Sequence, residues 1–112
     1  MSQSKGVALV TGAAQGIGRA IAIKLAQDGF DLALNDLSTK KAMLEEFAAE
    51  LEHGEEPNRP YRTRTCIVLA DVTDEDDVKR MVDNTVEALG SLDVVSSNTK
   101  FMIVGLTTYY HR

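Results

Sequence analysis

Three glycines near the start of the chain are spaced so that the backbone between them could bind a diphosphate. Gly12, Gly16 and Gly18 follow the apolar run at residues 7–10 and precede a stretch with helical periodicity. Gly12 lets the chain leave a strand through φ and ψ values that a Cβ would forbid. Gly16 and Gly18 remove side chains where a pyrophosphate would approach the backbone and where the helix would lie close to the strand. The free N–H groups of the first helical turn, with about half an elementary charge of the helix dipole behind them, would then face the anion.

The same loop carries a family resemblance. Its glycine spacing is G-x-x-x-G-x-G, which differs from the G-x-G-x-x-G of the common dinucleotide fingerprint. The run Thr11-Gly12-x-x-x-Gly16-Ile17-Gly18 resembles the cofactor loop of the short-chain dehydrogenase/reductase family. The alternative is an ordinary glycine-rich strand-to-helix turn without a ligand. The resemblance implies cofactor contacts from Thr11, Gly12, Gln15, Gly16, Ile17 and Gly18.

An aspartate after the expected second strand bears on which dinucleotide would bind. Asp36 comes 24 residues after Gly12, and an acid there can accept hydrogen bonds from both hydroxyls of an adenosine ribose. Its charge would repel a 2′-phosphate about 4 Å away, at a cost of about 4 kcal/mol for an effective dielectric near 20. This cost corresponds to a loss of affinity for NADP on the order of a thousandfold. We therefore expect NAD rather than NADP, although Lys40 and Lys41 follow closely. A plain loop aspartate or helix-start acid is the alternative.

The resemblance adds further residues to the expected site. Asp71 and Val72 match the family's acidic position after the third strand, which holds the adenine ring, whereas alone Asp71 would be read as a turn residue. Asn98 lies in a run that corresponds to the family's L-D-x-x-V-N-N-A-G pattern, but Lys100 stands in place of its glycine. Leu37, Asp71, Val72 and Asn98 are thus expected to join Asp36 in binding the cofactor.

The family's catalytic pattern is absent from the sequence. The family transfers a hydride between a nicotinamide and a carbonyl or alcohol, with a serine and a Tyr-x-x-x-Lys pair. Thr65 stands four residues after Tyr61, and Tyr109 and Tyr110 have no residue at that position. We therefore assign no catalytic residue and no metal ligand, and we expect the 112 residues alone to be inactive. A small carbonyl or alcohol substrate would bind only if missing residues completed the site.

Two other functions remain open beside a family oxidoreductase represented by its cofactor-binding half. One is a module that senses or sequesters NAD without turnover, and the other is a non-functional truncated product. Within the family, the N-terminal run G-V-A-L-V-T-G-A-A-Q-G-I-G-R-A-I-A resembles acetoin or diacetyl reductases.

The remaining sequence supplies the elements that would position this site. Strands are expected at residues 7–10, 30–35, 65–70 and 92–96, the third buried on both faces, and Glu55 to Arg64 reads as an exposed loop. Helices between the strands end near Gly29, His53 and Gly90, and Thr73 with Asp76 resembles a capping box for the third. Expected apolar helix faces are Ile17, Ala20, Ile21 and Leu25, then Leu44, Phe47, Ala48 and Leu51, then Val78, Met81, Val82, Thr85, Val86 and Leu89.

This alternation predicts the α/β class, with a Rossmann-like doubly wound parallel sheet. Right-handed crossovers give the strand order 3-2-1-4, with two helices on one face, the third on the other, and the switch point at the glycine loop. We expect an incomplete NAD(P)-binding domain at residues 1–98, truncated after its fourth strand, and a divergent tail at residues 99–112. The fourth strand then forms an edge or is flanked only by the tail, and an exposed sheet face favours self-association.

Composition limits the partners. A net charge of −5 without a basic cluster disfavours nucleic acid, and no apolar run reaches the ~18 residues of a membrane span. The single cysteine, Cys66, excludes an internal disulfide and suits a reducing compartment. The first residues are too short and polar for a signal peptide. We therefore expect a cytoplasmic protein.

Overall fold

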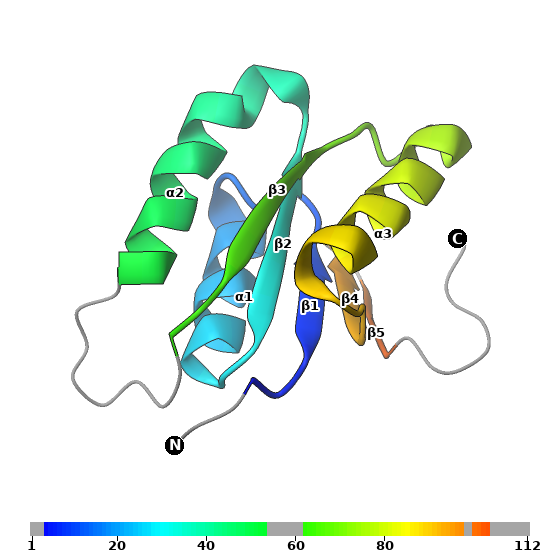
Figure 1. Ribbon diagram of the computed structural model, residues 1–112. Helices are drawn as coiled ribbons and strands as arrows, with labels where there is room; N and C mark the ends of the chain where they lie inside the picture. The colour runs from blue at the N-terminus through cyan, green and yellow to red at the C-terminus, as the bar shows by residue number, and fades with distance from the viewer. Residues whose placement is uncertain (1–3, 54–61, 98–99, 104–112) are drawn as a thin grey trace.

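The computed structural model describes residues 4–53, 62–97 and 100–103, which form one sheet flanked by helices (Figure 1). Its strands are β1 (Val7–Val10), β2 (Asp31–Asp36), β3 (Thr65–Leu69), β4 (Val94–Ser97) and β5 (Lys100–Ile103). Its helices are α1 (Gly16–Gln27), α2 (Lys41–His53) and α3 (Glu75–Leu89), and a short 3₁₀ turn, η1 (Ser38–Lys40), precedes α2. Among these helices none has the length and apolar character needed to cross a bilayer.

The strand order is β3-β2-β1-β4-β5, which confirms the expected 3-2-1-4 arrangement and adds a strand. The pairs β1–β2, β2–β3 and β1–β4 are parallel, so their carboxyl ends meet at one edge of the sheet. β5 pairs antiparallel with β4, and its residues come from the segment expected to be a divergent tail. Of the two expectations for β4, flanking by the tail is confirmed. Self-association stays a prediction.

The two faces of the sheet are covered as the crossovers require. α1 and α2 lie on one face, where Leu25 and Phe47 pack among Val10 and Leu34, and α3 covers the other face with Met81 (Figure 1). Side chains of β1 and β2 alternate between the two clusters, and every residue of β1 is at most 2% exposed. Burial on both faces explains why all of β1 and residues 32–34 of β2 are apolar without alternation.

Two helical faces differ from the predicted ones. The buried row of α1 is Gly18, Ala22, Leu25 and Ala26. Ile17 is 66% exposed and Ala20 is also exposed, so the predicted face was wrong at both positions. Gly18, Ala22 and Ala26, at a spacing of four, let α1 lie close against the sheet, and Ile17 and Ala20 lie about 100° and 200° around the helix from Gly18. In α3, Met81, Thr85 and Leu89 are buried at the same spacing, whereas Val86 is 42% exposed because it sits about 100° around the helix from Thr85.

β3 is less buried than predicted. Val68 is buried, but Thr65, Cys66, Ile67 and Leu69 are only half-buried. The expectation of complete burial was wrong because β3 is an edge strand of the sheet. The loop predicted at residues 55–64 lies mostly outside the described residues, and at its end Thr63 is buried.

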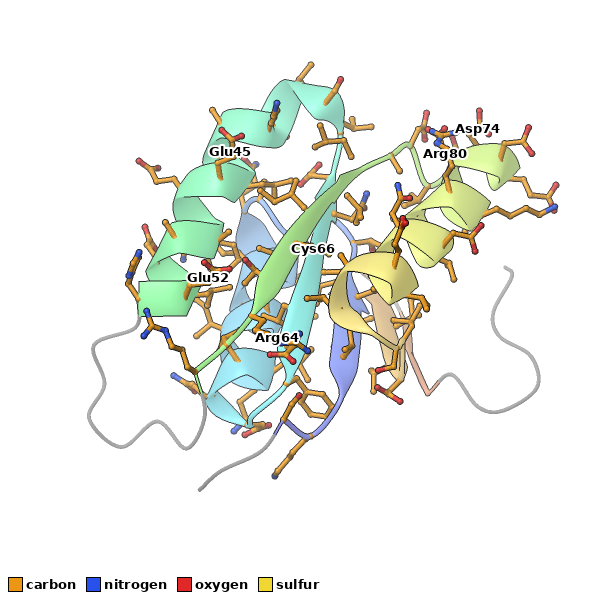
Figure 2. All side chains as sticks on the ribbon, viewed as in Figure 1. Glu45, Glu52, Arg64, Cys66, Asp74 and Arg80 are labelled. Carbon is orange, nitrogen blue, oxygen red and sulfur yellow. The ribbon has the colours of Figure 1, made fainter. Side chains whose placement is uncertain are left out.

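A buried carboxylate holds the amino edge of the sheet together. Asp31, fully buried at the start of β2, accepts hydrogen bonds from the Arg64 backbone N–H at 2.8 Å and from its guanidinium at 2.9 Å. The same guanidinium donates to the Leu89 carbonyl at the end of α3, at 3.2 Å. Figure 2 shows Arg64 at the end of β3 opposite to the one where α3 begins. The ion pair between Asp31 and Arg64 therefore lies at the edge of the sheet opposite to the carboxyl ends of the parallel strands.

Candidate functional site

The glycine loop leaves β1 at the point where the strand order reverses, between β2 and β4. On one side the backbone N–H of Thr11 donates to the Ser96 carbonyl of β4 at 3.0 Å. On the other side the N–H of Ala13 donates to the Asn35 carbonyl of β2 at 2.8 Å. The loop is thus tied to both neighbours of β1. In open α/β sheets this crevice outside the carboxyl ends of the strands is where ligands bind.

The three loop glycines meet three different requirements. Gly12 and Gly16 have φ values of 61° and 65°, in the left-handed region that favours glycine. A Cβ added to Gly18 would lie 2.1 Å from the carbonyl oxygen of Gly12, so α1 packs directly on the end of β1. A Cβ added to Gly16 would meet no heavy atom within 4 Å, because that position faces open space.

The first turn of α1 offers its N–H groups without a competing side chain. Its N-cap residue, Gln15, is extended and makes no capping hydrogen bond, and the turn contains no acidic residue. The start of α3 is the opposite case, since the carboxylate of Asp74 caps it and three acidic residues follow. An anion is therefore favoured at the start of α1, where the helix dipole and the N–H groups of the first turn face neither a capping bond from Gln15 nor an acidic residue of that turn.

Asp36 is bound to the glycine loop. Its Oδ2 accepts the N–H of Ala14 at 3.1 Å, and its Oδ1 accepts the N–H of Leu37 at 2.9 Å. The Nζ of Lys40 lies 3.4 Å from the Oε1 of Gln15, so this lysine also reaches the loop. The side chain of Lys41 turns instead to Glu45, at 4.0 Å. One carboxylate and one ammonium group therefore border the loop on the side of β2.

The segment after β3 runs beside the end of β2. The N–H of Ala70 donates to the Asp36 carbonyl at 3.2 Å, which places Asp71 next to the strand end that carries Leu37. Leu37 and Val72 are 48% and 50% exposed, and with Ile17 they are three of the five exposed large apolar residues that the described residues contain. Apolar side chains left in water at one edge of a sheet suit a flat, apolar ligand group.

Asp71 forms a local turn. Its Oδ1 accepts both the backbone N–H of Thr73 at 2.9 Å and the Thr73 hydroxyl at 2.6 Å. Its backbone N–H donates to Oδ2 of Asp77 at 3.0 Å. The turn interpretation of Asp71 is therefore correct for the protein alone, and an adenine contact stays a prediction.

The cap of α3 differs from the predicted capping box of Thr73 and Asp76. Asp74 is the N-cap residue, and its Oδ1 accepts the N–H of Asp76 at 2.9 Å and of Asp77 at 3.2 Å. The hydroxyl of Thr73, one residue before the cap position that Asp74 occupies, donates instead to Asp71. Figure 2 shows Asp74 at the start of the helix, beside Arg80.

Two carboxylates near this cap have lowered pKa values, which predicts that the stability of the folded state decreases at low pH. Hydrogen bonds from Thr73 lower the pKa of Asp71, and hydrogen bonds from the Asp71 backbone and from Arg80 lower the pKa of Asp77. A lowered pKa in the folded state contributes stability that is present above the unfolded value of about 3.9 and is lost as the pH falls through the folded value. We expect Asp77→Asn to reduce the loss of stability below about pH 4, measured by urea unfolding. The control is Asp83→Asn, an exposed position on the same helix. An unchanged pH dependence in Asp77→Asn would contradict this expectation.

Other groups that could take part in catalysis or metal binding are either unreactive, not clustered, or outside the described residues. Burial raises the pKa of the Cys66 thiol to about 11, so at neutral pH it is protonated and a poor nucleophile. In the described part of the chain no three His, Cys, Asp or Glu side chains are grouped to hold a metal ion. Asn98, the three tyrosines and His111 lie outside the described residues.

Asn35 is the main residue that the sequence reasoning missed. It is 1% exposed, its carbonyl accepts from the glycine loop, and its side chain donates to the end of β3. The available signal was an amide directly after the apolar residues 32–34 of the strand. A buried amide must find partners, so that position was a candidate for a polar role.

Comparison with known proteins agrees with this arrangement. The family model described as short chain dehydrogenase matches residues 6–108. A short-chain dehydrogenase/reductase of Armillaria gallica is 49% identical over 92 residues, and the match covers 82% of this chain and 33% of that protein. The L-2,3-butanediol dehydrogenase of Corynebacterium glutamicum is 39% identical over 92 residues, covering 82% of this chain and 33% of its own length.

A solved structure is similar over the same part of the chain. The alcohol dehydrogenase of the archaeon Thermococcus sibiricus, complexed with 5-hydroxy-NADP, superimposes with a TM-score of 0.68 and 36% identity. The match covers 80% of this chain and 35% of that structure. The chain thus spans about a third of the length of the relatives it matches.

Proposed function

The chain belongs to the short-chain dehydrogenase family, and on that basis we propose that its glycine loop and the adjoining strand ends bind a nicotinamide dinucleotide, NAD in preference to NADP. The single observation that carries the proposal is the start of α1. It lies at the reversal of strand order, has no capping side chain, and is reached through a glycine whose Cβ position faces open space. An anionic diphosphate is the ligand that such a helix start favours.

The residues present fit this group in three parts. The pyrophosphate is held by the N–H groups at Gly16 and Ile17, where no side chain competes. The adenosine ribose is held by Asp36, whose carboxylate is fixed at the edge of the loop. The adenine is held beside Leu37 and Val72, and Thr11, Gln15, Asp71 and Asn98 complete the site.

The preference for NAD is supported by charge. Asp36 is an anion at the position expected for the ribose, and a 2′-phosphate would bring a second negative group to it. Lys40 opposes this preference, since it borders the loop at Gln15. The comparisons do not favour NAD, because the Thermococcus sibiricus structure contains an NADP derivative. The preference therefore depends on Asp36 outweighing Lys40.

For these 112 residues we propose binding without turnover. Bound NAD supplies the hydride acceptor of the family's reaction, but no tyrosine in the sequence is followed by lysine four residues later. For the family's reaction itself we propose vicinal hydroxyketones and diketones such as acetoin and diacetyl as the substrate class. The N-terminal run and the likeness to an L-2,3-butanediol dehydrogenase support that class. A reducing compartment, the cytoplasm, suits the single cysteine.

Two measurements test the proposal. Titration calorimetry of the 112-residue protein with NAD and with NADP should give saturable binding of both, with NAD the tighter ligand. Spectrophotometric oxidation of NADH in the presence of diacetyl should give no rate above the protein-free reaction. Absence of dinucleotide binding by folded protein would overturn the proposed site, and a protein-dependent rate would overturn binding without turnover.

A further inference from the structure

One buried amide connects the two segments that the proposed function assigns to the cofactor. Asn35, at 1% exposure, donates from its Nδ2 to the carbonyls of Val68 at 3.0 Å and Ala70 at 3.2 Å. Its own main-chain carbonyl accepts the N–H of Ala13 in the glycine loop at 2.8 Å. A single residue of β2 therefore bonds both to the loop after β1 and to the chain leaving β3.

The position of the two acceptors explains why an amide is required. Asn35 lies opposite Val68 in the parallel register, and Ala70 is the first residue beyond the end of β3. Holding carbonyls on both sides of that strand end takes two N–H groups on one side chain, which asparagine has. Aspartate has none, threonine has one hydroxyl, and leucine of similar size has no donor.

Fixing Ala70 also fixes the direction in which the chain continues. Asp71 and Val72 follow at once, and the N–H of Ala70 donates to the Asp36 carbonyl on the same side. β3 is an edge strand, so on its outer flank no further strand among the described residues supports this exit. Beside the main-chain bond to Asp36, the side-chain amide of Asn35 ties this exit to β2.

We propose that Asn35 is a positioning residue that holds the segment after β3 at a fixed place relative to the glycine loop, so that one dinucleotide contacts both. This inference rests on the proposed function. Without the amide, the segment keeps its main-chain bond to Asp36 but loses two bonds to Asn35, so more of its order has to be gained when the ligand binds, and that ordering weakens binding. Loss of the amide should therefore lower the affinity for ligands long enough to contact both segments. It should not change the affinity for a ligand that contacts the glycine loop alone.

The test compares two ligands on Asn35→Leu. The affinity for NAD should fall by roughly ten- to hundredfold, as expected for two lost hydrogen bonds. The affinity for inorganic pyrophosphate, followed by amide chemical shifts of the glycine loop, should stay within about twofold because the main-chain carbonyl of residue 35 remains. In ligand-free protein, amide exchange at residues 70–72 should be about tenfold faster and that of Ala13 unchanged.

Controls separate this role from general destabilisation. Asn84→Asp, on the exposed side of α3, should alter none of these quantities. If circular dichroism shows that Asn35→Leu does not fold, Asn35→Thr replaces it, because threonine suits a strand and keeps one donor. Its affinity for NAD should also fall while its affinity for pyrophosphate stays unchanged. NAD affinity within twofold of the parent, or equal losses for NAD and pyrophosphate, would overturn the positioning role. Absence of NAD binding by the unmodified chain would instead count against the proposed function.

Discussion

Gly16→Ala should reduce NAD affinity by on the order of a hundredfold. The Cβ would project from the start of α1 into the open space where we place the pyrophosphate, and the ligand would have to move away from the N–H groups that hold it. The new residue would also occupy the left-handed region, at a cost of about 1–2 kcal/mol of stability. Titration calorimetry with NAD, together with urea unfolding, measures the two effects separately.

Gly90→Ala is a matched control for this substitution. Gly90 has a φ of 94°, and its added Cβ also meets nothing within 4 Å, but it follows the end of α3. The loss of stability should be similar in the two variants, whereas NAD affinity should change only in Gly16→Ala. Equal affinities would show that the open space beside Gly16 is not the pyrophosphate position.

Much of the fold follows from local pattern because apolar strand runs alternate with helical stretches that end at glycines or at a charged loop. The apolar run of β1, the glycines after it and the right-handed crossover rule together lead to the observed order of the first four strands. β5 was not predicted because four residues, Lys100–Ile103, carry too little periodicity to distinguish a strand from a tail. Its pairing depends on the edge that β4 presents, which is a tertiary property.

The cap of α3 and the bonds of Asn35 were not predicted because both depend on neighbours that only the folded chain brings together. Thr73 and Asp74 are both good N-cap residues, and in the structure Asp74 takes this position while the hydroxyl of Thr73 donates to Asp71. Asn35 was missed because its partners, the carbonyls of Val68 and Ala70, become its neighbours only through the register of β2 and β3. Spacing along the sequence does not determine that register.

The part of the candidate site that the backbone forms, the glycine loop, could be predicted from the sequence. Glycine spacing and the expected switch point placed the loop at the carboxyl edge, because both follow from chain direction. The surroundings of Asp36 were not predictable. Its bonds to Ala14 and Leu37, and the approach of Lys40 to Gln15, depend on how β2 and η1 lie against the loop. The balance of charge there decides between the two dinucleotides.

Asp36→Asn should therefore change the preference between NAD and NADP. We expect NADP affinity relative to NAD to rise by on the order of a hundred- to a thousandfold, because the substitution removes the negative charge facing the 2′-phosphate and leaves Lys40 nearby. The asparagine side chain has the same shape but only one acceptor oxygen, so it cannot keep both bonds to the N–H groups of Ala14 and Leu37. NAD affinity itself should fall modestly for that reason. Parallel titrations of each variant with NAD and NADP measure the ratio.

Salt and a charge-matched control distinguish this mechanism from a change in loop shape. A charge effect at a partly exposed site is screened, so the preference of the unmodified chain for NAD should shrink as ionic strength rises, and that of Asp36→Asn should hardly change. Asp83→Asn makes the same change of net charge on the exposed side of α3 and should leave the ratio as it was. If the ratio is insensitive to Asp36→Asn, or moves equally in Asp83→Asn, then Asp36 does not face the ribose. The role of Asp36 would then be limited to the hydrogen bonds that its carboxylate accepts at the loop, and Lys40 would favour binding of the 2′-phosphate.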